Sequence, residues 1–244
     1  MATLDKIKVA VRVRPFNKRE LSLGSSQTHS IVQMKNNQTI LQNPDEEEFS
    51  KHPKSFTFDH CFHSLDPQSQ DFASQADVFQ SVGTDILDNA FRGYNACIFA
   101  YGQTGSGKSY TMLGSADQPG IIPRLCVSLF ERIGGGESDA KVEVSYMEIY
   151  NEKVFDLLDL TSNKSGLKVR EHHLLGPYVD GLSKLAVTSF KVSRFISHQS
   201  ALRSTFNVNI NHSNRSEFIP FEMNKDFCLG FTDKFLSGNR NVDE

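Results

Sequence analysis

The chain has 244 residues, of which 38% are hydrophobic and 23% are charged, enough for one substantial hydrophobic core. Lys and Arg number 26 against 29 Asp and Glu, and this net charge of -3 argues against nucleic-acid or membrane binding by bulk charge. No stretch approaches the roughly 20 apolar residues of a membrane span, and the start lacks the apolar core of a signal peptide. We therefore expect a soluble cytoplasmic protein with no nucleic-acid partner and no membrane contact by this segment.

The N-terminal part of the chain is expected to form strands. Ile7 to Val13 alternates largely between apolar and polar residues until Pro15, which is the period-two pattern of a strand. Two further strand-like runs, Ser30 to Gln42 and Ser55 to Phe62, flank an acidic loop at Asp45 to Glu48. The like charges of that loop indicate a solvated turn with no assigned function.

From Ser74 the apolar residues change to helical spacing. Ser74 and Asp77 form a capping-box pattern, and Gly93 suits the end of the helix. The next run, Ala96 to Tyr101, is apolar throughout, as in a central strand covered on both faces, and it favours a parallel sheet. A second helix is expected from about Pro123 to Ile133.

Three further segments follow this helix. Lys141 to Tyr150 has the alternation of a strand, and Val154 to Leu158 is interpreted as a short amphipathic turn. Leu167 to Val187 resembles a hairpin with Gly176 and Pro177 near its tip. Helix and strand patterns that alternate around a glycine-rich loop indicate an α/β domain.

The cysteines and the histidines near them do not form a metal-binding pattern. The four cysteines are widely spaced and include no CxxC pair, so we expect reduced and mostly buried thiols. His60, Cys61 and His63 lie close together, but a tetrahedral site needs four placed ligands and the sequence offers no second cluster. No metal site is expected there.

The strongest motif fits the phosphate-loop pattern G-x-x-x-x-G-K-S/T. Its residues are Gly102, Gln103, Thr104, Gly105, Ser106, Gly107, Lys108 and Ser109. Glycines let the backbone turn tightly, so that several N–H groups converge on the β- and γ-phosphates of a nucleotide, while Lys108 adds a fixed cation. The Ser109 hydroxyl can hold Mg²⁺. Because the loop follows a predicted buried strand and precedes a helix, we expect nucleotide binding rather than a chance match.

The residues around this loop closely resemble the kinesin motor domain, and two later stretches resemble the kinesin-3 group of cargo-carrying motors. The stretches that carry the resemblance are Val11 to Pro15, Gly93 to Tyr101 leading into GQTGSGKSYTM, Ser145 to Glu152, Leu167 to Glu171 and Gly176 to Leu182. The resemblance covers about residues 5 to 190. It implies a P-loop NTPase of the kinesin motor type, whose central, mostly parallel sheet is flanked by helices and is incomplete at the C-terminal end.

The resemblance also implies a function. It implies a microtubule-stimulated ATPase, a plus-end-type motor that moves on the microtubules of the cytoskeleton. The phosphate loop would bind ATP with Mg²⁺, with Lys108 and Ser109 as the catalytic residues and Ser109 at the metal.

The family's R-x-R-P stretch lies beside the adenine base. The resemblance therefore implies that Arg12, Arg14 and Pro15 help to form the adenine pocket, with Tyr110 stacking from the far side. The alternative for the two arginines is the solvated face of an edge strand.

In kinesins, the hairpin corresponding to Leu167 to Ala186 touches β-tubulin. Its candidate contacts to the acidic microtubule surface are Lys168, Arg170, His172 and His173. The alternative for the two histidines is that they are ordinary surface residues.

After about residue 190 the chain departs from the family. The last 54 residues hold seven of the 19 Phe, and Ser213 to Glu217 matches the switch I pattern S-S-R-S-H at three of five positions, a level that chance can reach. The tail has no D-x-x-G of switch II; the one in the chain runs from Asp117 to Gly120. We therefore expect the N-terminal part of a motor domain at 1–190 and a divergent tail without regular structure at 191–244. The alternative function is a non-hydrolysing nucleotide- or microtubule-binding fragment from a truncated isoform.

Overall fold

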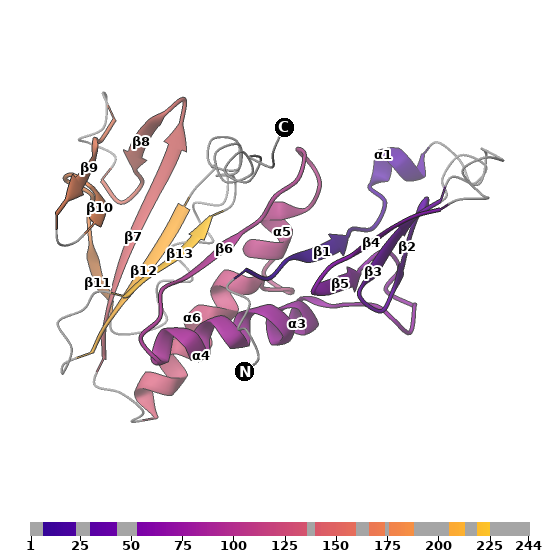
Figure 1. Ribbon diagram of the computed structural model, residues 1–244, viewed down its shortest axis with the longest axis horizontal. Coiled ribbons are helices and arrows are strands. Elements are labelled where there is room, and N and C mark those ends of the chain that lie inside the picture. The colour runs from indigo at the N-terminus through magenta and orange to yellow at the C-terminus, as the bar shows by residue number, and fades with distance from the viewer. Residues whose placement is uncertain are drawn as a thin grey trace, which may run out of the picture. The chain divides into compact units, whose positions relative to one another are not determined.

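The computed structural model describes residues 7–22, 30–42, 53–135, 140–159, 166–173, 176–187, 205–212 and 219–224. These belong to two compact units, Met1–Ser81 and Val82–Glu244, and each unit is described by itself. Figure 1 shows their helices and strands. Among the described helices, none combines the length and the hydropathy that crossing a bilayer requires.

The first unit is built mainly from short strands. They are β1 (Ala10–Val13), β2 (Val32–Lys35), β3 (Gln38–Leu41), β4 (Lys54–Thr57) and β5 (His60–His63). β1 pairs in parallel with β5, while β2, β3 and β4 form an antiparallel sheet. The strand predicted at Ile7 to Val13 is confirmed as β1, whereas each of the two later runs, Ser30 to Gln42 and Ser55 to Phe62, is divided between two strands. The acidic loop at 45–48 lies outside the described residues.

The helix predicted from Ser74 is confirmed and has three parts. They are α3 (Gln75–Val78), a π-helical turn η1 (Phe79–Gly83) and α4 (Thr84–Phe91). The Ser74 hydroxyl accepts a hydrogen bond from the Asp77 N–H at 3.3 Å, and the Asp77 carboxylate accepts one from the Ser74 N–H at 2.8 Å. This is the predicted capping box, which satisfies donors that the first helical turn leaves open.

The second unit contains a six-stranded sheet in the order β11-β7-β12-β13-β6, with β8 paired to β7. Its strands are β6 (Ala96–Phe99), β7 (Ala140–Tyr150), β8 (Lys153–Asp156), β11 (Leu185–Val187), β12 (Thr205–His212) and β13 (Ile219–Asn224). β6 pairs in parallel with β13, as its unbroken apolar run indicates, and the other described pairs in this sheet are antiparallel. The strand predicted at Lys141 to Tyr150 is confirmed as β7.

Two predictions about local structure after β7 are corrected. The amphipathic turn predicted at Val154 to Leu158 is largely strand β8, because its backbone pairs with β7 from Lys153 to Asp156. The predicted hairpin is confirmed as β9 (Val169–His172) and β10 (Gly176–Val179), with Gly176 near its tip as predicted, but the hairpin does not extend to Val187. β11, which follows, pairs with β7 and so belongs to the large sheet.

The tail also differs from the expectation. β12 and β13 form two strands where no regular structure was expected, and β12 lies in register against β7 from Thr205 to His212. In their sequences, TFNVNINH and IPFEMN, apolar residues occupy every second position. This is the period-two pattern typical of strands, so the expectation of no regular structure was wrong for these two segments.

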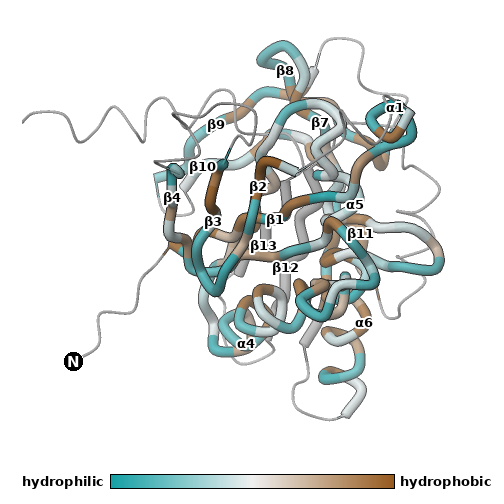
Figure 2. The backbone as a smooth tube through the Cα atoms, turned by 90° about the vertical axis from the view of Figure 1, so that its right-hand side faces the viewer, coloured by the Kyte–Doolittle hydropathy of each residue, from teal (hydrophilic) through white to brown (hydrophobic). Residues whose placement is uncertain are grey.

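Helices pack beside this sheet. α4 contacts both β6 and α6 (Ile121–Gly134), which confirms and slightly extends the second predicted helix. Figure 2 shows hydrophobic residues recurring between hydrophilic ones along α4 and α6. The Arg132 guanidinium on α6 forms an ion pair with Asp88 at 2.6 Å and lies over the Phe91 ring at 5.4 Å, which fixes α6 to α4. Side chains buried in this core include Leu87, Ala90, Ile98, Met112, Ile122, Leu125, Leu129 and Val144.

Candidate functional site: a phosphate loop

The phosphate loop connects the end of β6 to the start of helix α5 (Lys108–Met112). Within β6, Ile98 is buried, whereas Phe99 is 55% exposed, so the expected cover on both faces is not met at Phe99. The strand therefore packs against the core through the face that carries Ile98. Its other face, with Cys97 and Phe99, is exposed. The predicted context of the motif, a strand before it and a helix after it, is confirmed.

Glycine is required at two positions of the loop. Gly102 has φ 150°, and a Cβ there would lie 2.5 Å from the Ser106 hydroxyl oxygen. Gly107, which precedes the first residue of α5, has the left-handed φ of 97°. L-residues with a side chain rarely adopt these conformations, so the loop's path depends on its glycines.

Lys108 reaches back across the loop. Its ammonium group donates hydrogen bonds to the carbonyl oxygens of Gly102 at 2.8 Å and Gln103 at 3.2 Å. The Ser106 N–H donates to the Gln103 carbonyl at 3.1 Å, which closes a tight turn in the middle of the loop. The Lys108 ammonium group thus lies over the loop, where it could form an ion pair with a bound phosphate.

The residues that follow Lys108 are accessible. Ser109 is exposed, and its carbonyl accepts the N–H of Leu113 at 2.8 Å, so its backbone belongs to the helical turn while its hydroxyl faces outward. Tyr110 is 44% exposed. A glycine-shaped loop, a positioned ammonium and an accessible hydroxyl form a donor set that suits a nucleotide phosphate with a divalent cation.

Arg12 lies in the first unit and is held by neighbours of its own unit. Its Nε donates to the Ser64 hydroxyl at 2.9 Å, and its Nη1 donates to Gln75 Oε1 at 2.7 Å. Gln75 is 2% exposed, so one end of this contact is in the protein interior. Arg12 is thus half-buried and held within its own unit, and both its adenine-side role and the strand-face alternative stay predictions.

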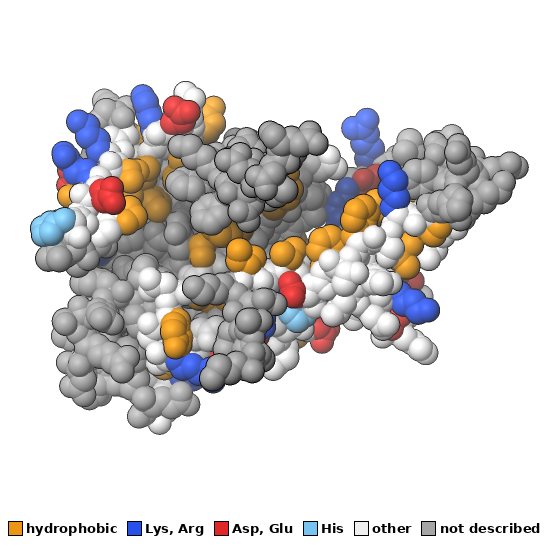
Figure 3. Space-filling view, in the orientation of Figure 1, with side chains coloured by type: hydrophobic (Ala, Val, Ile, Leu, Met, Phe, Trp, Pro, Cys, Tyr) orange, Lys and Arg blue, Asp and Glu red, His pale blue; other side chains and the backbone are white. Residues whose placement is uncertain are grey.

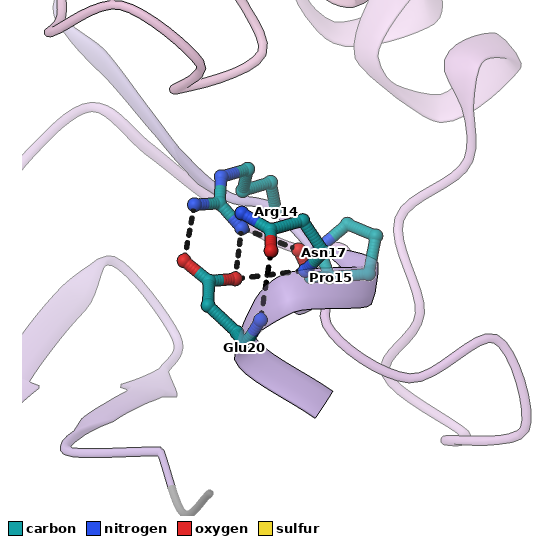
Figure 4. Close-up of polar contacts among 4 residues, drawn as sticks. All are labelled: Arg14, Pro15, Asn17 and Glu20. Carbon is teal, nitrogen blue, oxygen red and sulfur yellow. Dashed lines mark hydrogen bonds and ion pairs between the residues drawn. The ribbon is translucent and has the colours of Figure 1, made fainter. Parts of the chain in front are cut away.

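Arg14 is held by a carboxylate at the start of helix α1 (Lys18–Leu21). Its Nη1 and Nη2 donate to the two oxygens of Glu20 at 2.8 and 2.7 Å, and Nη1 also donates to the carbonyl of Pro15 at 2.8 Å. The Asn17 N–H donates to Glu20 as well, at 2.7 Å, and Figure 4 shows this closed network. The Arg14 guanidinium, followed by the Asn17 N–H, lowers the pKa of the Glu20 carboxyl to about 2.

The predicted nucleotide-binding residues are divided between the two units. Arg12, Arg14 and Pro15 belong to the first unit, whereas the phosphate loop and Tyr110 belong to the second. The structure therefore brings residues 102 to 110 together as one site. The adenine-side role of the other three residues stays a prediction.

The β9–β10 hairpin carries the predicted basic contacts. Lys168, Arg170 and His173 are exposed there, and Figure 3 shows Lys, Arg and His side chains gathered at the left, over this hairpin. Arg170 forms an ion pair with Asp180 at 2.6 Å, and the rings of His172 and His173 lie 4.5 Å apart. Part of the positive charge on this face is thus neutralised locally.

The histidine and cysteine cluster near residue 60 is spread over both faces of β5. The His60 ring stacks on Phe62, with centroids 5.9 Å apart, and Cys61 contacts the Thr39 hydroxyl at 3.4 Å. Alternate residues of a strand point to opposite faces, so His60 and Cys61 diverge. Within the described part of the chain, no group of three or more His, Cys, Asp or Glu side chains is placed to hold a metal ion.

Sequence reasoning missed three polar residues that organise the structure: Glu20, Gln75 and Asp156. The spacing N-x-x-E at Asn17 to Glu20 is a capping-box variant and could have indicated Glu20. Gln75 and Asp156 are each 2% exposed, and each has a partner that is distant in sequence, Arg12 for Gln75 and Ser183 for Asp156, which no local pattern reveals. The partial switch I match at 213–217 lies outside the described residues.

Comparison with known proteins adds the family context. A family model described as the kinesin motor domain matches residues 12–222. The human kinesin-like protein KIF13B is 55% identical over 97% of this chain, which corresponds to 13% of its own length. The rat kinesin-like protein KIF1A is 47% identical over 97% of the chain and 14% of its own length. The chain thus spans only a small part of these relatives, and the match runs beyond residue 190, where the motifs alone had ended it.

Solved structures are similar as well. KIF14 residues 391–772, a dimer in the two-heads-bound state with AMP-PNP in complex with a microtubule, aligns with a TM-score of 0.76 and 34% identity. The alignment covers 90% of this chain and 67% of that one. KIF14 residues 391–755 with ADP in complex with a microtubule aligns with a TM-score of 0.74 over the same shares.

Proposed function

Because the chain belongs to the kinesin motor domain family, with the kinesin-3 relationship and the P-loop NTPase fold that its motifs predict, we propose that it binds Mg-ATP and acts in an ATP-dependent microtubule motor. One observation carries the nucleotide-binding part of this proposal. Lys108 is held over a glycine-shaped loop by two loop carbonyls, 2.8 and 3.2 Å away. This is the geometry in which a phosphate can replace carbonyl oxygens as the partner of the ammonium group.

Each residue of the loop has a role in the proposal. The backbone N–H groups of residues 102 to 109 bind the β- and γ-phosphates, and Lys108 neutralises their charge. The exposed Ser109 hydroxyl is a ligand for Mg²⁺, which, when bound, neutralises charge that develops on the phosphates during transfer. Tyr110, with Arg12, Arg14 and Pro15, contributes to the adenine side of the site.

The partner in this proposal is the microtubule. Two similar KIF14 structures are complexes with a microtubule, and one contains AMP-PNP while the other contains ADP. The exposed Lys168 and Arg170 give the β9–β10 hairpin a chemistry that suits an acidic tubulin surface. We place the activity on the cytoplasmic microtubule cytoskeleton, with movement of the plus-end type.

A second function is kept because of a specific observation. Ser213 to Glu217 differs from the switch I pattern S-S-R-S-H at two of five positions. Phosphoryl transfer needs residues that position the attacking water and respond to the γ-phosphate. The alternative is therefore a chain that binds nucleotide or microtubules and does not turn ATP over.

Steady-state ATPase assays with and without microtubules separate the two functions. Motor activity predicts that microtubules raise the rate well above its basal value, and that Lys108→Ala lowers it by about a hundredfold or more, as for loss of a transition-state charge contact. Lys35→Ala, an exposed lysine on β2, is the matched control and should leave the rate unchanged. A rate that microtubules do not change would reject the motor activity and leave the binding function.

A further inference from the structure

The last residue of β8, Asp156, places a carboxylate in the protein interior. Asp156 is 2% exposed. A buried carboxylate is strongly unfavourable unless hydrogen bonds replace the water that it loses. The hydrogen-bond donors around the Asp156 carboxylate therefore indicate which segments it connects.

Asp156 joins two segments that are far apart in sequence. Its Oδ1 accepts the N–H groups of Leu158 at 2.8 Å and Asp159 at 3.3 Å, which fixes the turn that follows β8. Its Oδ2 accepts the N–H of Ser183 at 2.7 Å. Ser183 lies after the β9–β10 hairpin and just before β11, so this bond ties the exit of the hairpin to β8.

The entry of the hairpin is tied to the same strand. The Leu167 N–H donates to the Val154 carbonyl at 2.7 Å, two residues before Asp156. Gly166 has φ 78° and passes so close to β8 that a Cβ would lie 3.0 Å from the Cβ of Lys153. β8 is itself paired with β7, in the sheet that also contains β6. Both ends of the hairpin are thus bound to β8. This strand belongs to the same sheet as β6, which leads into the phosphate loop.

We propose that Asp156 is a positioning residue that fixes the direction of the β9–β10 hairpin relative to the sheet, so that partner binding by the hairpin depends on this buried carboxylate. The microtubule as partner rests on the proposed function. The hairpin's exposed Lys168 and Arg170 bind a partner together only while the hairpin keeps one orientation. Losing the bond to Ser183 loosens the segment between β10 and β11, so the hairpin and its charges can take more orientations.

The chemistry favours a carboxylate over its amide at this position. Both oxygens of Asp156 accept backbone N–H groups, Oδ1 from the β8 side and Oδ2 from Ser183. An asparagine has one acceptor oxygen and one NH₂ donor, so one set of N–H groups would face another donor. Asp156→Asn therefore breaks one of the two connections while keeping the volume of the side chain.

Amide hydrogen exchange tests the anchoring without any partner. In Asp156→Asn, the amides of 166–173 and 176–184 should exchange about ten- to a hundredfold faster, the range expected for a lost hydrogen bond to a charged group. Ser183→Pro removes the donor from the other side of the same bond and should give the same local pattern. Asp71→Asn, an exposed carboxylate of the first unit, is the control and should leave hairpin exchange unchanged.

Microtubule co-sedimentation and nucleotide binding complete the test. The proposal predicts that Asp156→Asn and Ser183→Pro weaken microtubule affinity about tenfold, while the Mg-ATP-induced rise in melting temperature stays that of the wild type. A purely structural role would instead lower both. Unchanged hairpin exchange, or faster exchange with unchanged microtubule affinity, would overturn the proposal. Wild-type chain that does not sediment with microtubules would contradict the proposed function, and the exchange result alone would then decide the anchoring role.

Discussion

Two cationic side chains, Lys108 in the second unit and Arg14 in the first, are held by different kinds of acceptor. Lys108 donates to carbonyl oxygens of its own loop, whereas Arg14 donates from both terminal nitrogens to the carboxylate of Glu20. A carbonyl is a neutral acceptor that phosphate oxygens can replace, while a bidentate carboxylate pair is a strong charge-assisted interaction in its own right. The comparison indicates that phosphate oxygens could replace the carbonyl partners of Lys108, whereas Arg14 contributes first to the local structure of its unit.

The largest expected effect comes from the loop's backbone. Gly102→Ala puts a side chain on a residue with φ 150°, which L-residues rarely adopt, and its Cβ would lie 2.5 Å from the Ser106 hydroxyl oxygen, so the local loop geometry is strained. We expect the stabilisation by Mg-ATP to be lost while the fold without nucleotide remains. Differential scanning calorimetry with and without Mg-ATP measures both quantities.

Gly134→Ala on α6 is the matched control, because nothing lies within 4 Å of its added Cβ. It should keep the full response to Mg-ATP. If Mg-ATP stabilised Gly102→Ala as much as the wild type, the loop geometry would not be needed for binding. The proposed difference between Lys108, which would bind a ligand, and Arg14, which supports local structure, would then lose its basis.

A smaller effect is expected at the Arg14 network. Arg14 and the Asn17 N–H lower the pKa of Glu20 from 4.5 to about 2, so the ionised carboxylate is favoured in the folded state. The stabilisation is therefore fully present above pH 4.5 and is lost as the pH falls toward 2. Glu20→Gln should lower the melting temperature slightly at pH 7 and by progressively less as the solution is acidified from pH 4.5.

Thermal melts of wild type and Glu20→Gln between pH 7 and pH 2.5 check this dependence, with Glu131→Gln on an exposed position of α6 as the control. The Mg-ATP response at pH 7 should change less in Glu20→Gln than in Gly102→Ala. A difference between the two proteins that does not depend on pH would contradict the ion-pair explanation.

The smallest effect leaves stability unchanged and concerns thiol reactivity in the second unit. Cys97 on β6 is exposed, whereas burial raises the pKa of Cys126 on α6 to about 12. Iodoacetamide should therefore modify Cys97 in the native protein and Cys126 only after unfolding, since the thiolate is the reacting species. Peptide mass spectrometry over a time course measures this order. Equal rates would contradict the burial of Cys126 in the packing of α6 against α4 and α5.

The sequence predicts those parts whose cause is local. The phosphate loop follows from glycine conformations and a lysine at fixed spacing, and the capping box at Ser74 follows from two residues three apart. The long helices and β7 follow from periodicity. Glycine and capping rules act within a few residues, so a linear pattern is enough to find them.

The contacts that the sequence did not predict depend on distant partners. β12 is different, because Phe206, Val208 and Ile210 alternate with asparagines in the period-two pattern of a strand, so its own sequence indicates the strand that then pairs with β7. The Asp156 to Ser183 bond spans 27 residues, and the contact between Arg12 and Gln75 spans 63. At the candidate site, residues 102 to 110 were predictable from local sequence, whereas the holding of Arg14 by Glu20 required the side-chain geometry.

The most direct test of the central claim, that the loop around Lys108 binds Mg-ATP, is thermal unfolding of the wild-type chain with and without this ligand. At a concentration about 100 times Kd, binding should stabilise the fold by about 2.7 kcal/mol. For a domain of this size the melting temperature should rise by about 5 to 11 °C, and Lys108→Ala should abolish the rise. A cooperative melt that Mg-ATP does not move, or a rise that Lys108→Ala retains, would contradict the claim.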